Sequence, residues 1–204
     1  QESQLRVLDL DHQSFADPDS IRSCVRNILV SSDPMETEYK PSGIYRKASE
    51  DLVNGVAAAI STAAGNSFLI AKITAMTEAT AERVPDVDNA AWRNELPRRA
   101  GPAMRRDLHM RLGPQASRAA ELLLPIAYGL GDGLPWEDVW PRLASALSAE
   151  HNRYDQDDIL WLRRAAGSYV VEGNSATGSV YRIFHRALAE HLLEGRDQAR
   201  DHAT

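Results

Sequence analysis

Two groups of acidic residues carry the side chains best suited to hold a metal ion or to position a water molecule. Asp9, Asp11 and His12 follow a short apolar segment, and carboxylates at the end of a strand can bind Mg²⁺. The second group, at residues 155–158, lacks the glycine and the terminal glutamate of a calcium loop. We favour a surface turn for the first group and helix capping for the second. No metal site is predicted.

A basic stretch at residues 98–111 is the strongest concentration of positive charge. It contains Arg98, Arg99, Arg105, Arg106 and Arg111, with Asp107 as its acid. A basic helical face can contact nucleic acid or a phosphate. Because the whole chain has a net charge of −6, we favour a solvated face that pairs with acidic residues elsewhere.

His185 stands between an alternating apolar segment and the last helical pattern of the chain. An imidazole at such a junction can point into a cleft between domains and donate a hydrogen bond to a phosphate. A helix N-cap or a core histidine is the alternative, and the residue pattern by itself favours it. The tryptophans lie at helical spacings typical of a core rather than of a ligand cage: Trp92, Trp136, Trp140 and Trp161.

The motifs of several large enzyme classes are absent from the sequence. It has no Gly-x-x-x-x-Gly-Lys-Ser/Thr loop for phosphates, no Gly-x-Ser-x-Gly nucleophile elbow and no His-Glu-x-x-His zinc motif. Cys24 is the one cysteine, which excludes a disulfide framework and a cysteine-based zinc site. We therefore do not expect these residues to form an enzyme by themselves.

Length and composition favour a globular protein of one or two domains. The chain has 204 residues, 43% of them hydrophobic and 25% charged. No apolar run approaches the roughly 18 residues of a membrane span, and residues 1–4 do not resemble a secretory signal. We therefore expect a cytoplasmic location and no membrane partner. The net negative charge also disfavours a partner bound through phosphate contacts, so nucleic acid is not expected.

The elements that must position these residues are mostly helical. Residues 5–10 alternate as a strand does, and apolar stripes at helical spacing follow over 21–29, 52–63 and 68–82. Gly65-Asn66 separates the last two stripes. A short helix around Trp92 comes next.

In the second half of the chain, the spacing of apolar residues changes from helical to alternating near the end. Helical patterns cover 96–112, with a kink at Gly101-Pro102, then 116–128, 136–147 and 155–166. Two alternating segments, at 169–172 and 180–184, flank a glycine-rich loop and predict a β-hairpin. A last helix runs over 186–193.

Three helices followed by a hairpin are the order of a winged-helix domain. The fold class predicted is therefore mainly α, a helical bundle followed by a winged-helix domain with one β-hairpin. We expect the parts to be residues 1–16, the end of a preceding domain; 17–113, a helical bundle; 114–193, the winged helix; and 194–204, a polar tail. The strand at 5–10 has no neighbour to pair with here, which is why we assign it to a domain that precedes the chain.

The second half carries a resemblance to a known family. Its motifs are Leu124-Pro125-Ile126-Ala127-Tyr128-Gly129, then Gly133-Leu134-Pro135 with Val139-Trp140, Asp158-Ile159-x-Trp161-Leu162, and Val180 to Leu188. In these motifs the chain resembles the arm of bacterial STAND ATPases, the signal-transducing NTPases of the NACHT and NB-ARC classes. The resemblance covers nearly the whole chain, is strongest at 116–193 and is weaker at 1–82. It implies that residues 1–16 are the end of a nucleotide-binding domain and that the bundle at 17–113 is the helical lid.

The resemblance implies a cofactor, ATP or ADP, bound in the full-length protein rather than by these residues alone. Gly65 and Phe68 fall where the family has a Gly-Leu-Pro-Leu or Gly-Asn-Phe-Leu motif that packs beside the adenine. His185 falls in the family's Met-His-Asp motif, whose histidine touches the β-phosphate of ADP. Ser67-Phe68 replaces Leu-Pro here, and Arg186 replaces the aspartate.

The function that the resemblance implies is that of a regulatory arm, which couples the nucleotide state to the release of an effector. Its partners would be the nucleotide-binding domain of the same chain, an effector domain and a repeat sensor domain, and the resemblance allows a homo-oligomer in the active state. A winged-helix DNA-binding regulator is one alternative, with residues 157–166 as its recognition helix. A nucleotide-independent adaptor module is the other.

Overall fold

The computed structural model describes residues 17–31, 41–129, 133–136, 138–175, 178–197 and 201. The strand expected at 5–10, the acidic group after it and most of the loop expected at 31–43 lie outside these residues. The chain divides into two compact units, the first ending at Arg99 and the second running from Ala100 onward. The described part is mainly helical, with a small antiparallel sheet in the second unit.

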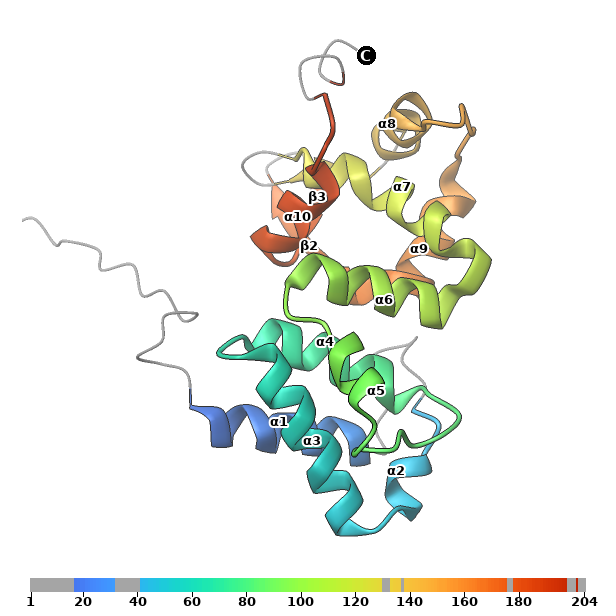
Figure 1. The fold of residues 1–204 in the computed structure, drawn as a ribbon. Helices are drawn as coiled ribbons and strands as arrows, with labels where there is room; N and C mark the ends of the chain where they lie inside the picture. Colours follow the sequence, from blue (N-terminus) through green and yellow to red (C-terminus); the bar gives the residue numbers. More distant parts are fainter. Residues whose placement is uncertain are drawn as a thin grey trace, which may run out of the picture. The chain divides into compact units, whose positions relative to one another are not determined.

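The first unit contains only helices among its described residues. In chain order these are α1 (Pro18–Val30), α2 (Ile44–Lys47), α3 (Glu50–Ala64), α4 (Phe68–Ala79) and α5 (Ala90–Glu95). α1 packs against both α3 and α4 (Figure 1). Its Ile21 and Val25 are completely buried, as the predicted apolar stripe requires.

Short polar side chains begin four of these helices. Asp17, Ser49, Ser67 and Asn89 accept hydrogen bonds from backbone N–H groups in the first turns of α1, α3, α4 and α5. Those N–H groups have no partner within their own helix, and each such cap stabilises a helix by about 1 kcal/mol. Local chemistry therefore sets where these helices begin.

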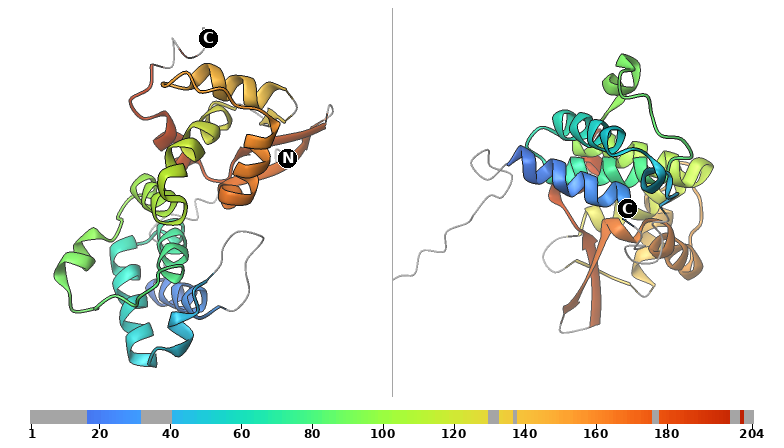
Figure 2. Two further views of the ribbon diagram at one scale, coloured as in Figure 1. Left: turned by 90° about the vertical axis from the view of Figure 1, so that its right-hand side faces the viewer. Right: turned by 90° about the horizontal axis from the view of Figure 1, so that it is seen from below.

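The second unit combines helices with three short strands. In chain order it contains α6 (Ala100–Leu112), η2 (Gly113–Gln115), α7 (Ala116–Ala127), β1 (Leu134–Pro135), α8 (Val139–Leu147), α9 (Gln156–Ala166), η3 (Gly167–Tyr169), β2 (Val170–Ser175), β3 (Gly178–Ile183) and α10 (Arg186–Leu193). α7 packs against α6, α8, α9 and α10. Figure 2 shows β2 and β3 extending past the helices of this unit as a narrow two-stranded arm.

The sheet is antiparallel with the strand order β1-β3-β2. The hairpin pairs Val170 with Ile183, and the predicted hairpin is therefore confirmed. The sequence did not predict β1, which pairs Leu134 with Tyr181. Gly133 permits this pairing, since its φ is +119° and a Cβ there would lie 2.6 Å from the Tyr181 carbonyl oxygen.

The strand β1, which the sequence did not predict, also shifts the start of α8. We expected Trp136 on the buried face of this helix, whereas α8 begins at Val139. Trp136 lies in the turn between β1 and α8, where its carbonyl accepts a hydrogen bond from the Trp140 N–H. Trp136 and Trp140 are four residues apart, as on one face of a helix, but only Trp140 lies in α8. Leu134 and Pro135 pair with β3 immediately before Trp136, so the helix begins later than the spacing predicts.

α6 lies in the second unit, whereas the sequence suggested a boundary near Gly113-Pro114. Its Met104 and Leu108 are buried, and the helix packs against α7 and α10. Gly101-Pro102 falls in the first turn of α6 instead of kinking it, and a proline there loses no helical hydrogen bond. A Cβ at Gly101 would lie 2.3 Å from the His191 ring, so the glycine lets α10 approach.

Candidate functional site

The turn between α3 and α4 holds two of the residues that the resemblance singles out. Gly65 ends α3 with φ +60°, and nothing lies within 4 Å of a Cβ added there. The glycine is therefore required by the backbone conformation rather than by lack of space. Phe68 is the first residue of α4 and is 39% exposed. An exposed ring at the start of a helix can stack on a planar ligand.

His185 is the N-cap of α10, directly after β3. Its Nδ1 accepts a hydrogen bond from the Ala187 N–H at 3.2 Å, and its ring meets Phe184 edge to face with centroids 6.2 Å apart. The helix-cap interpretation is therefore confirmed. Because Nδ1 is the acceptor, the neutral ring carries its proton on Nε2, which is the atom able to donate to a phosphate.

The three residues belong to two different units. Gly65 and Phe68 share one turn of the first unit, and His185 lies in the second. Neither unit brings all three together within itself.

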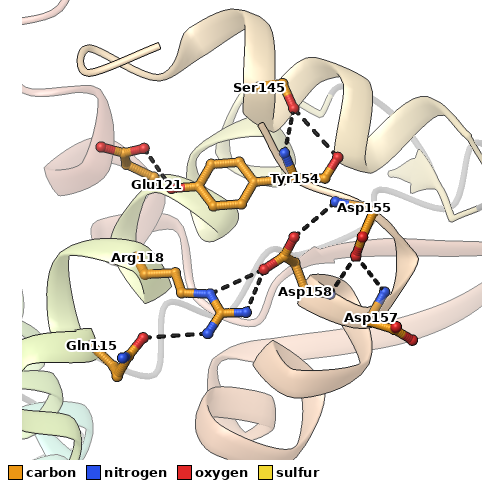
Figure 3. Close-up of polar contacts among 8 residues, drawn as sticks. All are labelled: Gln115, Arg118, Glu121, Ser145, Tyr154, Asp155, Asp157 and Asp158. Atoms are coloured by element: carbon orange, nitrogen blue, oxygen red, sulfur yellow. Dashed lines mark hydrogen bonds and ion pairs between the residues drawn. The ribbon is translucent and has the colours of Figure 1, made fainter. Parts of the chain in front are cut away.

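The acidic group at residues 155–158 caps α9 (Figure 3). The Asp155 side chain accepts from the backbone N–H groups of Asp157 and Asp158, and Asp158 accepts from the Asp155 N–H at 2.8 Å. Asp158 also forms an ion pair with Arg118 of α7. These carboxylates are used within the fold, which confirms helix capping.

The loop before α9 is held to α7 and α8 by a second set of contacts. The Tyr154 hydroxyl donates to Glu121 of α7 at 2.7 Å, and its backbone N–H donates to Ser145 of α8 at 2.8 Å (Figure 3). Burial and the hydrogen bond to Glu121 raise the pKa of Tyr154 to about 12. Tyr154 therefore anchors the end of this loop nearest α9 to both neighbouring helices.

The outer face of α9 offers little positive charge. Arg163 pairs with Glu172 at 3.1 Å and lies over the ring of Trp136, 4.6 Å from its centroid. Leu160 is 43% exposed beside it. Arg164 bonds back to the Leu160 carbonyl at 3.3 Å. A helix that reads a DNA groove needs cations aimed at phosphates, and this face does not supply them.

The basic stretch at 98–111 is not one solvated face. Arg111 donates two hydrogen bonds to Asp107, at 2.8 and 2.6 Å, and both side chains are buried. Tyr169 donates to the same carboxylate at 2.6 Å. Burial, followed by the charge of Asp107, raises the pKa of Tyr169 well above its usual value. The prediction for Arg111 was wrong, and the acid–base spacing of i and i+4 from Asp107 was the signal that could have corrected it.

The core prediction for the tryptophans is met in full by Trp140, which has no exposed surface and donates to the Leu122 carbonyl at 2.7 Å. Trp136 and Trp161 are half-buried and lie under Arg163 and Arg118. Trp92 of α5 is half-buried as well. Three of the four rings therefore lie at the margin of the core.

Among the described residues, no group of three or more His, Cys, Asp or Glu side chains is arranged to hold a metal ion. The helices described here are all too short or too polar to cross a membrane. No known family model, curated protein or solved structure matches the chain significantly.

Proposed function

We propose that the chain is the regulatory arm of a STAND-type ATP-dependent switch. In this proposal the first unit is the helical lid, and the elements from α7 to α10 form a winged-helix domain. The order helix, strand, helix, helix, strand, strand and the sheet order β1-β3-β2 support the winged-helix assignment. The wing is then the β2–β3 hairpin.

The observation that carries the proposal is the geometry at His185. A rigid strand ends here and a helix begins, so the imidazole is held by its own N-cap bond. That bond selects Nε2–H as the donor, which is what contact with a phosphate oxygen requires. A preorganised donor of this kind costs little entropy when the ligand arrives.

A contact of this kind can operate a switch. If His185 touches a phosphate of ADP in the resting arrangement and leaves it in the active one, ADP stabilises the resting state by its differential affinity. Phe68 would contribute adenine stacking from the lid.

DNA binding is the competing function of a winged helix, and the features of α9 disfavour it. The first turn of the helix is acidic, Arg163 is engaged by Glu172 and Trp136, and Leu160 occupies the outer face. A nucleotide-independent adaptor remains the alternative if nucleotide has no effect.

The test is nucleotide binding by the intact gene product, measured by calorimetry for the wild type, His185→Ala and His185→Ser. A hydrogen bond to a charged group contributes ~1.5–3 kcal/mol, so both variants should lose roughly ten- to a hundredfold in ADP affinity. ATP affinity should fall less. Serine is a good N-cap but is too short to replace the imidazole, so His185→Ser controls for loss of the helix cap.

Equal losses for both nucleotides, or full ADP affinity in His185→Ser, would leave His185 as a structural cap. A phosphate-binding Gly-x-x-x-x-Gly-Lys-Ser/Thr loop encoded ahead of Gln1 in the same gene is an independent expectation of the proposal. Retarded migration of duplex DNA, relieved by salt, would instead favour the DNA-binding function.

A further inference from the structure

The end of α8 and the loop that follows it line a pocket of about 560 Å³ that is wide open to solvent. Its walls are formed by Arg142, Ser145, Ala146, Ser148, His151, Asn152, Arg153 and Tyr154. This volume lies within the range of small-molecule sites, roughly 300–1,000 Å³. The pocket lies within the second unit and includes none of Gly65, Phe68 and His185.

The charge of the walls contrasts with that of the protein. The chain carries a net charge of −6, yet the pocket is lined by two guanidinium groups and an imidazole and by no carboxylate. Such a lining attracts anions locally even in an acidic protein.

The two arginines are not neutralised within the described part of the chain. Arg153 is exposed and has no ion-pair or hydrogen-bond partner among these residues. Arg142 approaches Asp138 at 3.9 Å, and both side chains are about four-fifths exposed. A surface pair at that distance contributes little, so the Arg142 guanidinium can turn to a ligand at small cost.

A buried hydroxyl among the lining residues adds a donor to the pocket. Ser148 is 6% exposed and accepts a hydrogen bond from the Asn152 N–H at 3.1 Å. Its own proton goes to no acceptor in the described residues. A buried donor without an acceptor is unusual in a folded protein and is satisfied when an anion or water occupies the pocket.

The backbone of this loop is also held in an uncommon conformation. His151 has φ +60°, and it is the one non-glycine residue with positive φ among those described. Such strain costs of order 1–3 kcal/mol and is often found at binding sites, because it aims a side chain that an ordinary turn would not. Here the strained residue is His151 itself, whose side chain lines the pocket.

We propose that this pocket binds the phosphate group of a small organic phosphate, with Arg142 and Arg153 as the charged ligands and Ser148 as a buried donor. Guanidinium groups match the geometry of phosphate oxygens with paired N–H donors. The pocket is larger than one phosphate, which favours a phosphate that carries an organic group over the inorganic ion. The proposal is independent of nucleotide binding at His185.

The test is NMR titration of the ¹⁵N-labelled 204-residue chain with ribose 5-phosphate, inorganic phosphate and chloride at one ionic strength. Both phosphates should shift the amide signals of residues 148–154, with ribose 5-phosphate the tighter, and chloride should not. Arg142→Gln and Arg153→Gln should each weaken binding by about tenfold. Arg164→Gln removes an exposed positive charge of α9 outside the pocket and should leave the affinity unchanged.

Equal shifts with chloride, or undiminished binding in the Arg142→Gln/Arg153→Gln double variant, would overturn the proposal. So would duplex DNA that binds more tightly than ribose 5-phosphate and loses affinity in the same variants, since that result would assign the surface to nucleic acid. The three side chains changed in these variants are exposed, and circular dichroism checks that each variant folds.

Discussion

Individual buried side chains of the second unit have unequal consequences for stability. Trp140 fills the space between α7 and α8 and also satisfies the Leu122 carbonyl. Asp107 does something different, because it accepts from Arg111 and Tyr169 at once and so joins α6 to the segment before β2. Trp140 therefore stabilises the unit mainly by filling space, and Asp107 by its charge and hydrogen bonds.

Trp140→Ala should lower the free energy of unfolding by roughly 3–5 kcal/mol, the usual range for deleting a large buried aromatic side chain. Urea denaturation followed by circular dichroism measures the loss. Trp140→Phe keeps much of the volume and should lose less. An unchanged midpoint in Trp140→Ala would mean that the ring is not buried.

Asp107→Asn should cost about 3–5 kcal/mol, because it leaves the buried Arg111 without its counter-charge. Tyr169→Phe removes a single hydrogen bond to the same carboxylate and should cost about 1.5–3 kcal/mol. Chemical denaturation of the two variants and of their double mutant gives the coupling between them. Additive losses would contradict a shared network.

At the scale of elements, β1 depends on a glycine that has no tolerance for a side chain. Gly133 combines φ +119° with a close approach to Tyr181 of β3. Gly178 in β3 has a similar φ of +132° but open space around it. A side chain at either glycine would strain the backbone, but only at Gly133 would it also clash with a neighbouring strand.

Gly133→Ala should destabilise the second unit by more than Gly178→Ala does. Both substitutions incur strain of order 1–3 kcal/mol, and only the first also forces β1 away from β3. Thermal melts report the difference, and hydrogen exchange at Tyr181 shows whether β1 has separated. Equal losses in the two variants would mean that the pairing of β1 contributes nothing.

The capping network before α9 shows how one element is held by several others. Arg118 and Glu121 lie one turn apart on α7, and they hold Asp158 of α9 and Tyr154 of the preceding loop. The helix thus receives its orientation from α7 as well as from its own capping box. α9 and the loop that lines the proposed phosphate pocket are therefore both bonded to the same helix, α7.

At the scale of the whole molecule, the tyrosines make stability depend on alkaline pH. Tyrosines of an unfolded chain ionise near pH 10. In the folded chain Tyr154 and Tyr169 keep their protons to higher pH, with the pKa of Tyr154 raised to about 12. Their contribution is therefore complete below pH 10 and is lost as the pH rises toward the folded pKa values.

The free energy of unfolding should accordingly fall between about pH 10 and 12. Urea midpoints measured across this range give the slope, and phenolate absorbance follows the ionisation itself. The double variant Tyr154→Phe/Tyr169→Phe should show a shallower slope than the wild type. A slope that is the same in both proteins would show that these two hydroxyls ionise normally in the folded chain.

The sequence by itself determined the features that depend on neighbours along the chain. Apolar stripes with capping residues such as Asp17 and Asp155 located the helices, and the period-two segments around the glycine-rich loop located β2 and β3. His185 could be recognised as a cap candidate because it stands where a strand pattern changes to a helical one. In each case the interactions that decide the structure span only a few residues.

The tertiary structure alone decided the features that depend on distant partners. β1 has two residues, too few for a pattern, and exists because Gly133 lets it reach β3. Arg111 is buried rather than solvated because Tyr169, 58 positions later in the numbering, helps to satisfy Asp107 beside it. The pocket proposed to bind phosphate depends on a loop that Tyr154 holds to Ser145 of α8 and Glu121 of α7. Contacts over such separations leave no periodic signal in the sequence.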